Sequence, residues 1–140
     1  MVTPNLDRFK NICTNIYSSI PDDYDWQWED RFSVVMTVFD KIDMDEIRTS
    51  VLQGFDQHWD SSNVNDAPEV IISLIKALYG ISPGQVLFHT DQETGILLYA
   101  AWWPWGNGVN ISLRIGIYQP QEKIFKEEEL EQHLKEWFSL

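Results

Sequence analysis

The spacing of apolar residues changes near Gly80, and this change constrains the fold more than any other feature of the sequence. Before Gly80 the apolar residues recur every three or four positions, the period of a helix with one buried face. After it the period changes to two, which predicts strands over 85–90, 96–105 and 109–118. Asn107-Gly108 separates the last two stretches and favours a tight hairpin turn. The second half of the chain is therefore predicted to form a three-stranded antiparallel meander.

The helical spacing predicts four helices before the strands and one after them. We expect these helices at 6–20, 32–39, 43–59, 66–80 and 127–138. The segment 32–39 has a strand as its alternative, because Val and Phe dominate it. Helices, then a meander, then a closing helix packed on the sheet make an α+β fold. A chain of 140 residues without a linker or repeat is the length of one domain, so we expect a single domain over 1–140.

The register of the last hairpin decides which side chains share a face of the sheet. With a two-residue turn at Asn107-Gly108, Trp102 faces Leu113, Ala100 faces Ile115 and Leu98 faces Ile117, which forms an apolar face. A first turn that places Thr90 opposite Ile96 adds Val86 and Phe88 to that face. A three-residue loop at 106–108 would exchange the two faces. With the two-residue turn, the opposite face carries a mixture of aromatic and polar residues: His89, Tyr99, Trp103, Trp105, Asn110, Ser112, Arg114 and Tyr118.

The charge of the chain is strongly negative and unevenly distributed. The 22 acidic residues outnumber the 10 basic ones, which gives a formal charge of −12. Direct binding to nucleic acid or to an anionic membrane needs positive charge, so we expect neither. Residues 20–69 hold 13 of the acids and only three of the bases. The acidic half is therefore the part of the chain predicted to attract a basic partner protein.

The candidate partner-binding residues combine these acids with aromatic side chains. Aromatic anchors supply most of the binding energy at tight interfaces, and the charges around them steer association and select the partner. The alternative is that the tryptophans belong to the core and that the acids only keep the protein in solution. The predicted residues are Asp22, Asp23, Asp25, Trp26, Trp28, Glu29, Asp30, Asp56, Asp60, Trp103 and Trp105.

No residue pattern indicates catalysis, a cofactor or a bound metal. Cys13 lies on an apolar helical face, so we expect a buried thiol rather than a nucleophile. The pairs His58 with Asp60 and His89 with Asp91 lack the spacing of a zinc site, and hydrogen bonds at turns are the simpler interpretation. The phosphate-binding loop and the nucleophile elbow are both missing from the sequence. We therefore expect no enzyme activity and no cofactor.

The N-terminal residues contain no apolar run like that of a signal peptide, and no stretch approaches the ~20 apolar residues of a spanning helix. We therefore expect a cytoplasmic protein.

Small size, acidity, cytoplasmic character and the Trp-rich segment 95–106 (GILLYAAWWPWG) together resemble the immunity proteins that bacteria make against their own polymorphic or contact-dependent toxins. The resemblance is one of overall character, without a shared motif. It implies a non-catalytic, stoichiometric inhibitor of a basic toxin domain, often a nuclease, whose basic surface holds phosphates. Two alternatives remain open. The first is an acidic nucleic-acid mimic or adaptor that binds a basic host protein. The second is a small enzyme or ligand-binding domain with aromatic residues around a pocket.

Overall fold

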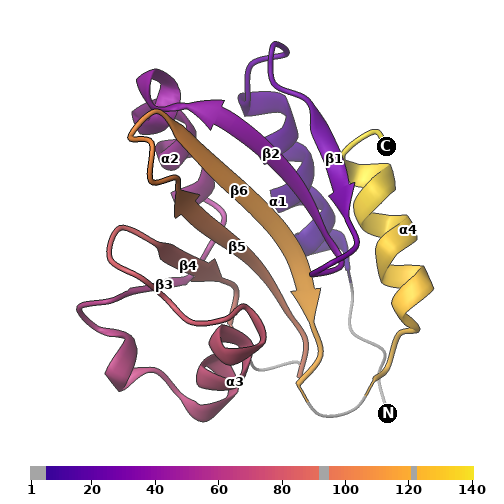
Figure 1. Cartoon of the computed structure of the whole chain (residues 1–140). Coiled ribbons are helices and arrows are strands. Elements are labelled where there is room, and N and C mark those ends of the chain that lie inside the picture. The colour runs from indigo at the N-terminus through magenta and orange to yellow at the C-terminus, as the bar shows by residue number, and fades with distance from the viewer. Residues whose placement is uncertain (1–5, 92–94, 121–122) are drawn as a thin grey trace.

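The computed structural model describes residues 6–91, 95–120 and 123–140 (Figure 1). The first half of the chain contributes helices and three strands: α1 (Asp7–Ser19), β1 (Trp26–Glu29), β2 (Val34–Asp40), the short helix η1 (Lys41–Asp43), α2 (Met44–Leu52) and β3 (Gln57–Asp60). The second half contributes η2 (Val64–Asp66), α3 (Glu69–Ala77), β4 (Val86–His89), β5 (Leu97–Pro104), β6 (Asn110–Tyr118) and α4 (Glu127–Trp137). None of the helices in the described residues is long and apolar enough to span a membrane.

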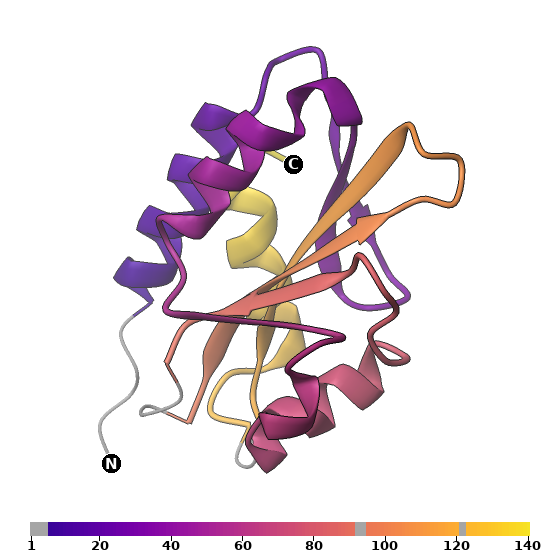
Figure 2. The same ribbon diagram turned by 90° about the vertical axis from the view of Figure 1, so that its left-hand side faces the viewer.

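All six strands join one antiparallel sheet in the order β1-β2-β6-β5-β4-β3. Helices α1, α2 and α4 pack together, and α4 contacts β2. Figure 2 shows α1 and α2 on one side of the sheet and α3 on the other. The side chains accordingly form two cores. The larger includes Phe39, Trp102 and Leu113 beneath α1, α2 and α4, and the smaller includes Leu87 and Tyr99 beneath α3.

The α+β class is confirmed, but the expectation of three strands is wrong, because β1, β2 and β3 extend the meander on both sides. The helix expected at 32–39 is a strand instead, so the alternative prediction is the correct one. Val35 and Phe39 point into the larger core and Val34 into the smaller, so β2 is apolar on both faces and lacks simple alternation.

The helix expected at 43–59 ends early. Its helical part stops at Leu52, and Trp59 lies in β3 at the sheet edge. Gly54 follows the helix and passes close to α1, because a Cβ at this position would lie 2.8 Å from Cγ2 of Ile12. This close approach favours glycine, which also weakens a helix at this point.

The register of the last hairpin is confirmed, because Leu98, Ala100 and Trp102 face Ile117, Ile115 and Leu113. The turn itself is wider than two residues. The amide of Trp105 donates to the carbonyl of Asn110 at 2.8 Å and closes a loop over 106–109.

Asn107 shapes this loop without adopting the positive φ that a tight turn would need. Its side-chain oxygen accepts from the amides of Val109 and Asn110, while Gly108 alone in the loop has a positive φ, of 70°.

The preceding hairpin is shifted by two residues from the expected pairing. The amide of Thr90 donates to the carbonyl of Leu98, not to Ile96, and Phe88 faces Ala100. A shift of two keeps every side chain on its face. Val86 and Phe88 therefore join the larger core as expected.

The opposite face is less open than its polar and aromatic residues suggest. Helix α3 covers the part formed by β4 and β5, where His89 and Tyr99 are buried. Trp103 is half-buried, and Trp105 at the hairpin end is exposed.

Gly116 in β6 fits a space that admits no larger residue. A Cβ there would lie 2.6 Å from the hydroxyl oxygen of Tyr99 and 2.7 Å from Cγ1 of Val34. Both neighbours are buried and have little freedom to move. We expect Gly116→Ala to lower the free energy of unfolding by about 1–3 kcal/mol, measured by urea denaturation.

Gly106 provides a matched control for this substitution, because nothing lies within 4 Å of its Cβ position and its φ is not positive. Gly106→Ala should change stability by no more than about 0.5 kcal/mol. Equal effects of the two substitutions would contradict the packing argument.

His89 is buried with both ring nitrogens engaged, which makes stability depend on pH. Its Nε2 accepts from the indole N–H of Trp59 at 2.9 Å, and its Nδ1 lies 2.6 Å from the carbonyl oxygen of Thr90, which requires a hydrogen on Nδ1. The ring is therefore neutral. Burial lowers the pKa of His89, against smaller raising effects from the Thr90 carbonyl and the Asp56 carboxylate.

The direction of the pH effect follows from this lowered pKa. As pH falls below about 6.5 the unfolded chain binds a proton that the folded chain does not, so the free energy of unfolding decreases. We expect the loss between pH 7 and pH 5, measured by urea denaturation, to be smaller in His89→Gln. Identical slopes in the wild type and in His89→Gln would show that His89 does not titrate on unfolding.

Candidate partner-binding surface

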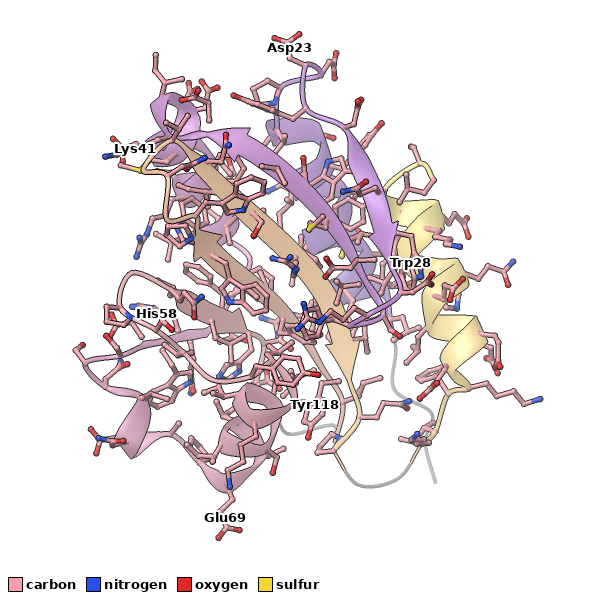
Figure 3. The ribbon with its side chains drawn as sticks, in the orientation of Figure 1. Asp23, Trp28, Lys41, His58, Glu69 and Tyr118 are labelled. Carbon is pink, nitrogen blue, oxygen red and sulfur yellow. The ribbon has the colours of Figure 1, made fainter. Side chains whose placement is uncertain are left out.

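Two acidic segments that are separate in sequence meet at one end of the molecule. The hydroxyl of Tyr24, in the loop between α1 and β1, donates to the carboxylate of Asp43 in η1 at 2.5 Å. The same hydroxyl accepts from the backbone amide of Asp40 at 3.2 Å. The bond to Asp43, aided by burial, raises the pKa of the Tyr24 phenol. Figure 3 shows Asp23 and Lys41, one from each segment, at this same end.

We call this region the acidic end. Its seven carboxylates come from the α1–β1 loop, the end of β2, η1 and the first turn of α2: Asp22, Asp23, Asp25, Asp40, Asp43, Asp45 and Glu46. The bases within these segments are Lys41, which is exposed, and Arg48, whose guanidinium lies 5.7 Å from the ring centre of Trp102. The ion pairs found among the described residues involve none of the seven carboxylates. Their negative field is therefore little compensated.

The end of the β5–β6 hairpin lies beside η1 and brings apolar groups to the acidic end. The amide of Lys41 donates to the carbonyl of Val109 at 2.7 Å. Three large apolar side chains are exposed here: Ile42 is 85% exposed, Val109 49% and Trp105 47%. A hollow of about 260 Å³ separates the hairpin from α2 and is lined by residues that include Met44 and Trp105. Exposed apolar groups therefore stand next to uncompensated carboxylates.

Four of the residues predicted from the sequence belong to this surface. Asp22, Asp23 and Asp25 are exposed in the loop, and Trp105 is exposed at the hairpin end. Trp26, only one residue beyond Asp25, points into the larger core, where it is 8% exposed and its ring centre lies 4.3 Å from that of Phe138. Its side chain therefore has almost no surface to offer a partner.

Trp28, Glu29 and Asp30 lie at the opposite end of β1, away from Asp22. The indole N–H of Trp28 donates to Asp30 at 2.8 Å, and Lys135 of α4 lies 5.3 Å from the Trp28 ring centre. Figure 3 shows Trp28 beside α4. These contacts link β1 to its own turn and to α4.

Trp103 and Glu29 meet at Arg114 on the face of the sheet opposite α1. Arg114 forms an ion pair with Glu29 at 2.7 Å, with both side chains less than one-fifth exposed. Its guanidinium also lies 4.4 Å from the ring centre of Trp103. Phe32 packs edge-on against Trp103, with ring centres 5.6 Å apart. These residues hold β1, β5 and β6 together.

Asp56 and Asp60 flank and end β3, at the sheet edge where Figure 3 shows His58. Asp56 accepts from Arg8 at 2.8 Å and from the amide of Asp91 at 2.9 Å, so it ties α1 to the end of β4. Asp60 accepts from the hydroxyl and amide of Ser62, and these bonds lower the pKa of Asp60. Both carboxylates therefore lie away from the acidic end.

The sequence prediction omitted Ile42 and Val109 and the four carboxylates contributed by β2, η1 and α2. The carboxylates are visible in the sequence as a cluster at 40–46. Ile42 is flanked there by Lys41 and Asp43, a setting that favours an exposed position. The tertiary bond from Tyr24 to Asp43, which joins this cluster to Asp22 and its neighbours, leaves no local sequence pattern.

Within the described ranges no group of three or more His, Cys, Asp or Glu side chains is arranged to hold a metal ion. Cys13 is a buried thiol, and burial raises its pKa well above its usual range. Comparisons with protein families, with curated proteins and with solved structures find no match for this chain.

Proposed function

We propose that this protein is a non-catalytic, immunity-type inhibitor that binds a basic toxin domain of the nuclease class through its acidic end. One observation carries the proposal: three exposed apolar side chains stand beside seven carboxylates that have no ion-pair partner among the described residues. Charge would bring the partner to this surface, and the apolar groups would hold it there.

The carboxylates and the apolar side chains would contribute to binding in different ways. Carboxylates in water contribute little net affinity, because docking removes their hydration, but they accelerate encounter with a positive surface by 10- to about 1,000-fold at low salt. Trp105 and Ile42 lose exposed apolar area when a partner covers them, and such side chains account for most of the binding energy. A domain that cleaves nucleic acid carries a positive surface to hold phosphates.

The apolar groups also favour an inhibitor over a nucleic-acid mimic. A mimic needs carboxylates spaced like phosphates over a polar surface. Here Ile42 lies within the run of carboxylates, and Val109 is adjacent to it through the bond from Lys41. An apolar centre in an acidic ring is typical of a specific protein–protein contact.

Reversing charge at the acidic end should weaken recruitment of the partner. We compare the tagged protein with the triple variant Asp22→Lys, Asp23→Lys, Asp25→Lys in affinity capture from native cells, washed at low and at moderate salt. We expect the wild type to hold one stoichiometric basic protein at both salt concentrations. The variant should associate with that protein at least about tenfold more slowly at low salt, with a flatter salt dependence, measured by stopped flow.

The matched control reverses three exposed carboxylates at the other end of the molecule: Glu69→Lys, Glu128→Lys, Glu129→Lys. It changes the net charge equally and should associate much faster than the first variant. Equal slowing of both variants would mean that only net charge matters and would exclude the acidic end as the docking surface. If the wild type captures no basic protein, the inhibitor proposal fails.

Trp105→Ala should act on the lifetime of the complex rather than on its formation. Half of this side chain is already in water, so we expect the fold to be retained. Loss of an interface anchor costs about 2 kcal/mol or more, which raises the dissociation rate by roughly thirtyfold. The rate is measured by surface plasmon resonance with the captured partner, together with the inhibition of its activity.

Two further variants distinguish the loss of a partner contact from the loss of packing within the protein. Leu52→Ala removes a side chain that is 41% exposed at the end of α2 and should leave dissociation unchanged. Trp103→Ala should lower the free energy of unfolding, because Arg114 and Phe32 pack on that ring. Unchanged dissociation of Trp105→Ala would remove the hairpin end from the interface.

A further inference from the structure

A second hollow lies at the end of the molecule opposite the acidic end, between α3, α4 and the end of β6. Its volume is about 360 Å³, within the range of small-molecule sites. Trp28 and Tyr118, both labelled in Figure 3, are among the residues that line it. The sheet ends here, so side chains from its two opposite faces reach the same space.

Part of the wall of this hollow is apolar. Leu74 of α3, Leu78 just after it, and Leu130 and Leu134 of α4 line it, and each is less than one-tenth exposed. Ile117 of β6 also lines it. A ligand with an apolar body would transfer that body from water to this wall, which is favourable in proportion to the area covered.

The rim carries one cation that no described carboxylate neutralises. Arg31, in the β1–β2 turn, is exposed and lines the hollow. Its guanidinium carbon lies 4.9 Å from the ring centre of Phe32 and 5.1 Å from that of Tyr79. These two cation–π contacts restrain the guanidinium, and because Arg31 is exposed its N–H groups are accessible to an acceptor.

The two segments that meet at Arg31 have ordinary local reasons for their positive φ angles. Ser33, with a φ of 55°, closes the β1–β2 turn, where its amide donates to the carbonyl of Asp30. Tyr79, with a φ of 67°, ends α3, where the next amide, of Gly80, donates to the carbonyl of Ile75.

The carboxylates at the rim are already engaged. Glu127 pairs with Lys123 at 3.2 Å, and Glu131 pairs with Lys135 at 2.8 Å. Their presence disfavours a ligand of higher negative charge. The rim therefore fits a single negative charge placed against Arg31, and a carboxylate accepts two parallel N–H bonds from a guanidinium.

We propose that this hollow binds a small amphiphilic carboxylic acid, with its apolar body between α3 and α4 and its carboxylate on Arg31. The site is separate from the acidic end and involves no covalent step. Its ligand adds a function to the chain beyond the binding of a partner protein.

Octanoate is the probe for this proposal, with octanol and acetate as the two controls. Octanol keeps the apolar body without the charge, and acetate keeps the charge without the body. Binding to the full chain is measured by isothermal titration calorimetry and by the change in total tryptophan fluorescence, to which Trp28 in the lining of the hollow contributes. We expect octanoate to bind at least about tenfold more tightly than either control, because bonds between charged groups add to the burial of the chain.

Arg31→Gln tests the assigned role of the cation, and Lys10→Gln on α1 is the control for a lost positive charge. Arg31→Gln should weaken octanoate about tenfold and leave octanol unchanged, whereas Lys10→Gln should change neither. Equal binding of octanoate and octanol, or an unchanged affinity in Arg31→Gln, would overturn carboxylate recognition. Absence of octanoate binding would overturn the site altogether. None of these results bears on partner capture, which depends on the opposite end.

Discussion

The pairing of β2 with β6 is the interaction on which the rest of the structure depends. It lies inside the sheet, with Val35 opposite Ile115 and Asp40 opposite Asn110. At one end of β2 it places η1 against the β5–β6 hairpin, and the hydroxyl of Thr37 holds the acidic loop by donating to the carbonyl of Asp25. At the other end it positions the turn that carries Arg31. Both surfaces to which we assign binding are therefore held by one buried strand.

The sequence predicted the last hairpin better than β2, because β6 alternates and a turn signal precedes it. The Asn107-Gly108 turn and the alternation of β6 allowed the pairing of Trp102 with Leu113 to be predicted, although β5 is buried on both faces. Val34 and Val35 are both fully buried, on opposite faces, so β2 shows no period of two. A short apolar run of this kind does not distinguish a strand from a buried helix. The edge strand β3 is only four residues long, and three of these are polar, which leaves an even weaker signal.

The candidate site was predictable where it depends on local composition and unpredictable where it depends on tertiary partners. The loop acids Asp22 and Asp23 are exposed as their charge and turn position suggest. Trp26 and Trp105 looked alike in the sequence, yet Phe138 packs on Trp26, whereas Trp105 remains 47% exposed. In the sequence Glu29 resembles its acidic neighbours, but the fold places Arg114, 85 positions away, within ion-pair distance of it.

The distribution of ion pairs gives the acidic end its significance. Elsewhere in the described structure cations pair with five carboxylates, as Arg8 does with Asp56 and Arg114 with Glu29, whereas others such as Glu69 are in none of these ion pairs. At the acidic end the fold brings like charges together, since the bond from Tyr24 to Asp43 places two negative segments in one region. Such repulsion lowers the stability of the free chain. A positive partner surface would relieve it on docking, so the electrostatic free energy that weakens the isolated protein favours the complex. A chain selected only for stability would separate these charges, which supports our proposal that a partner covers them.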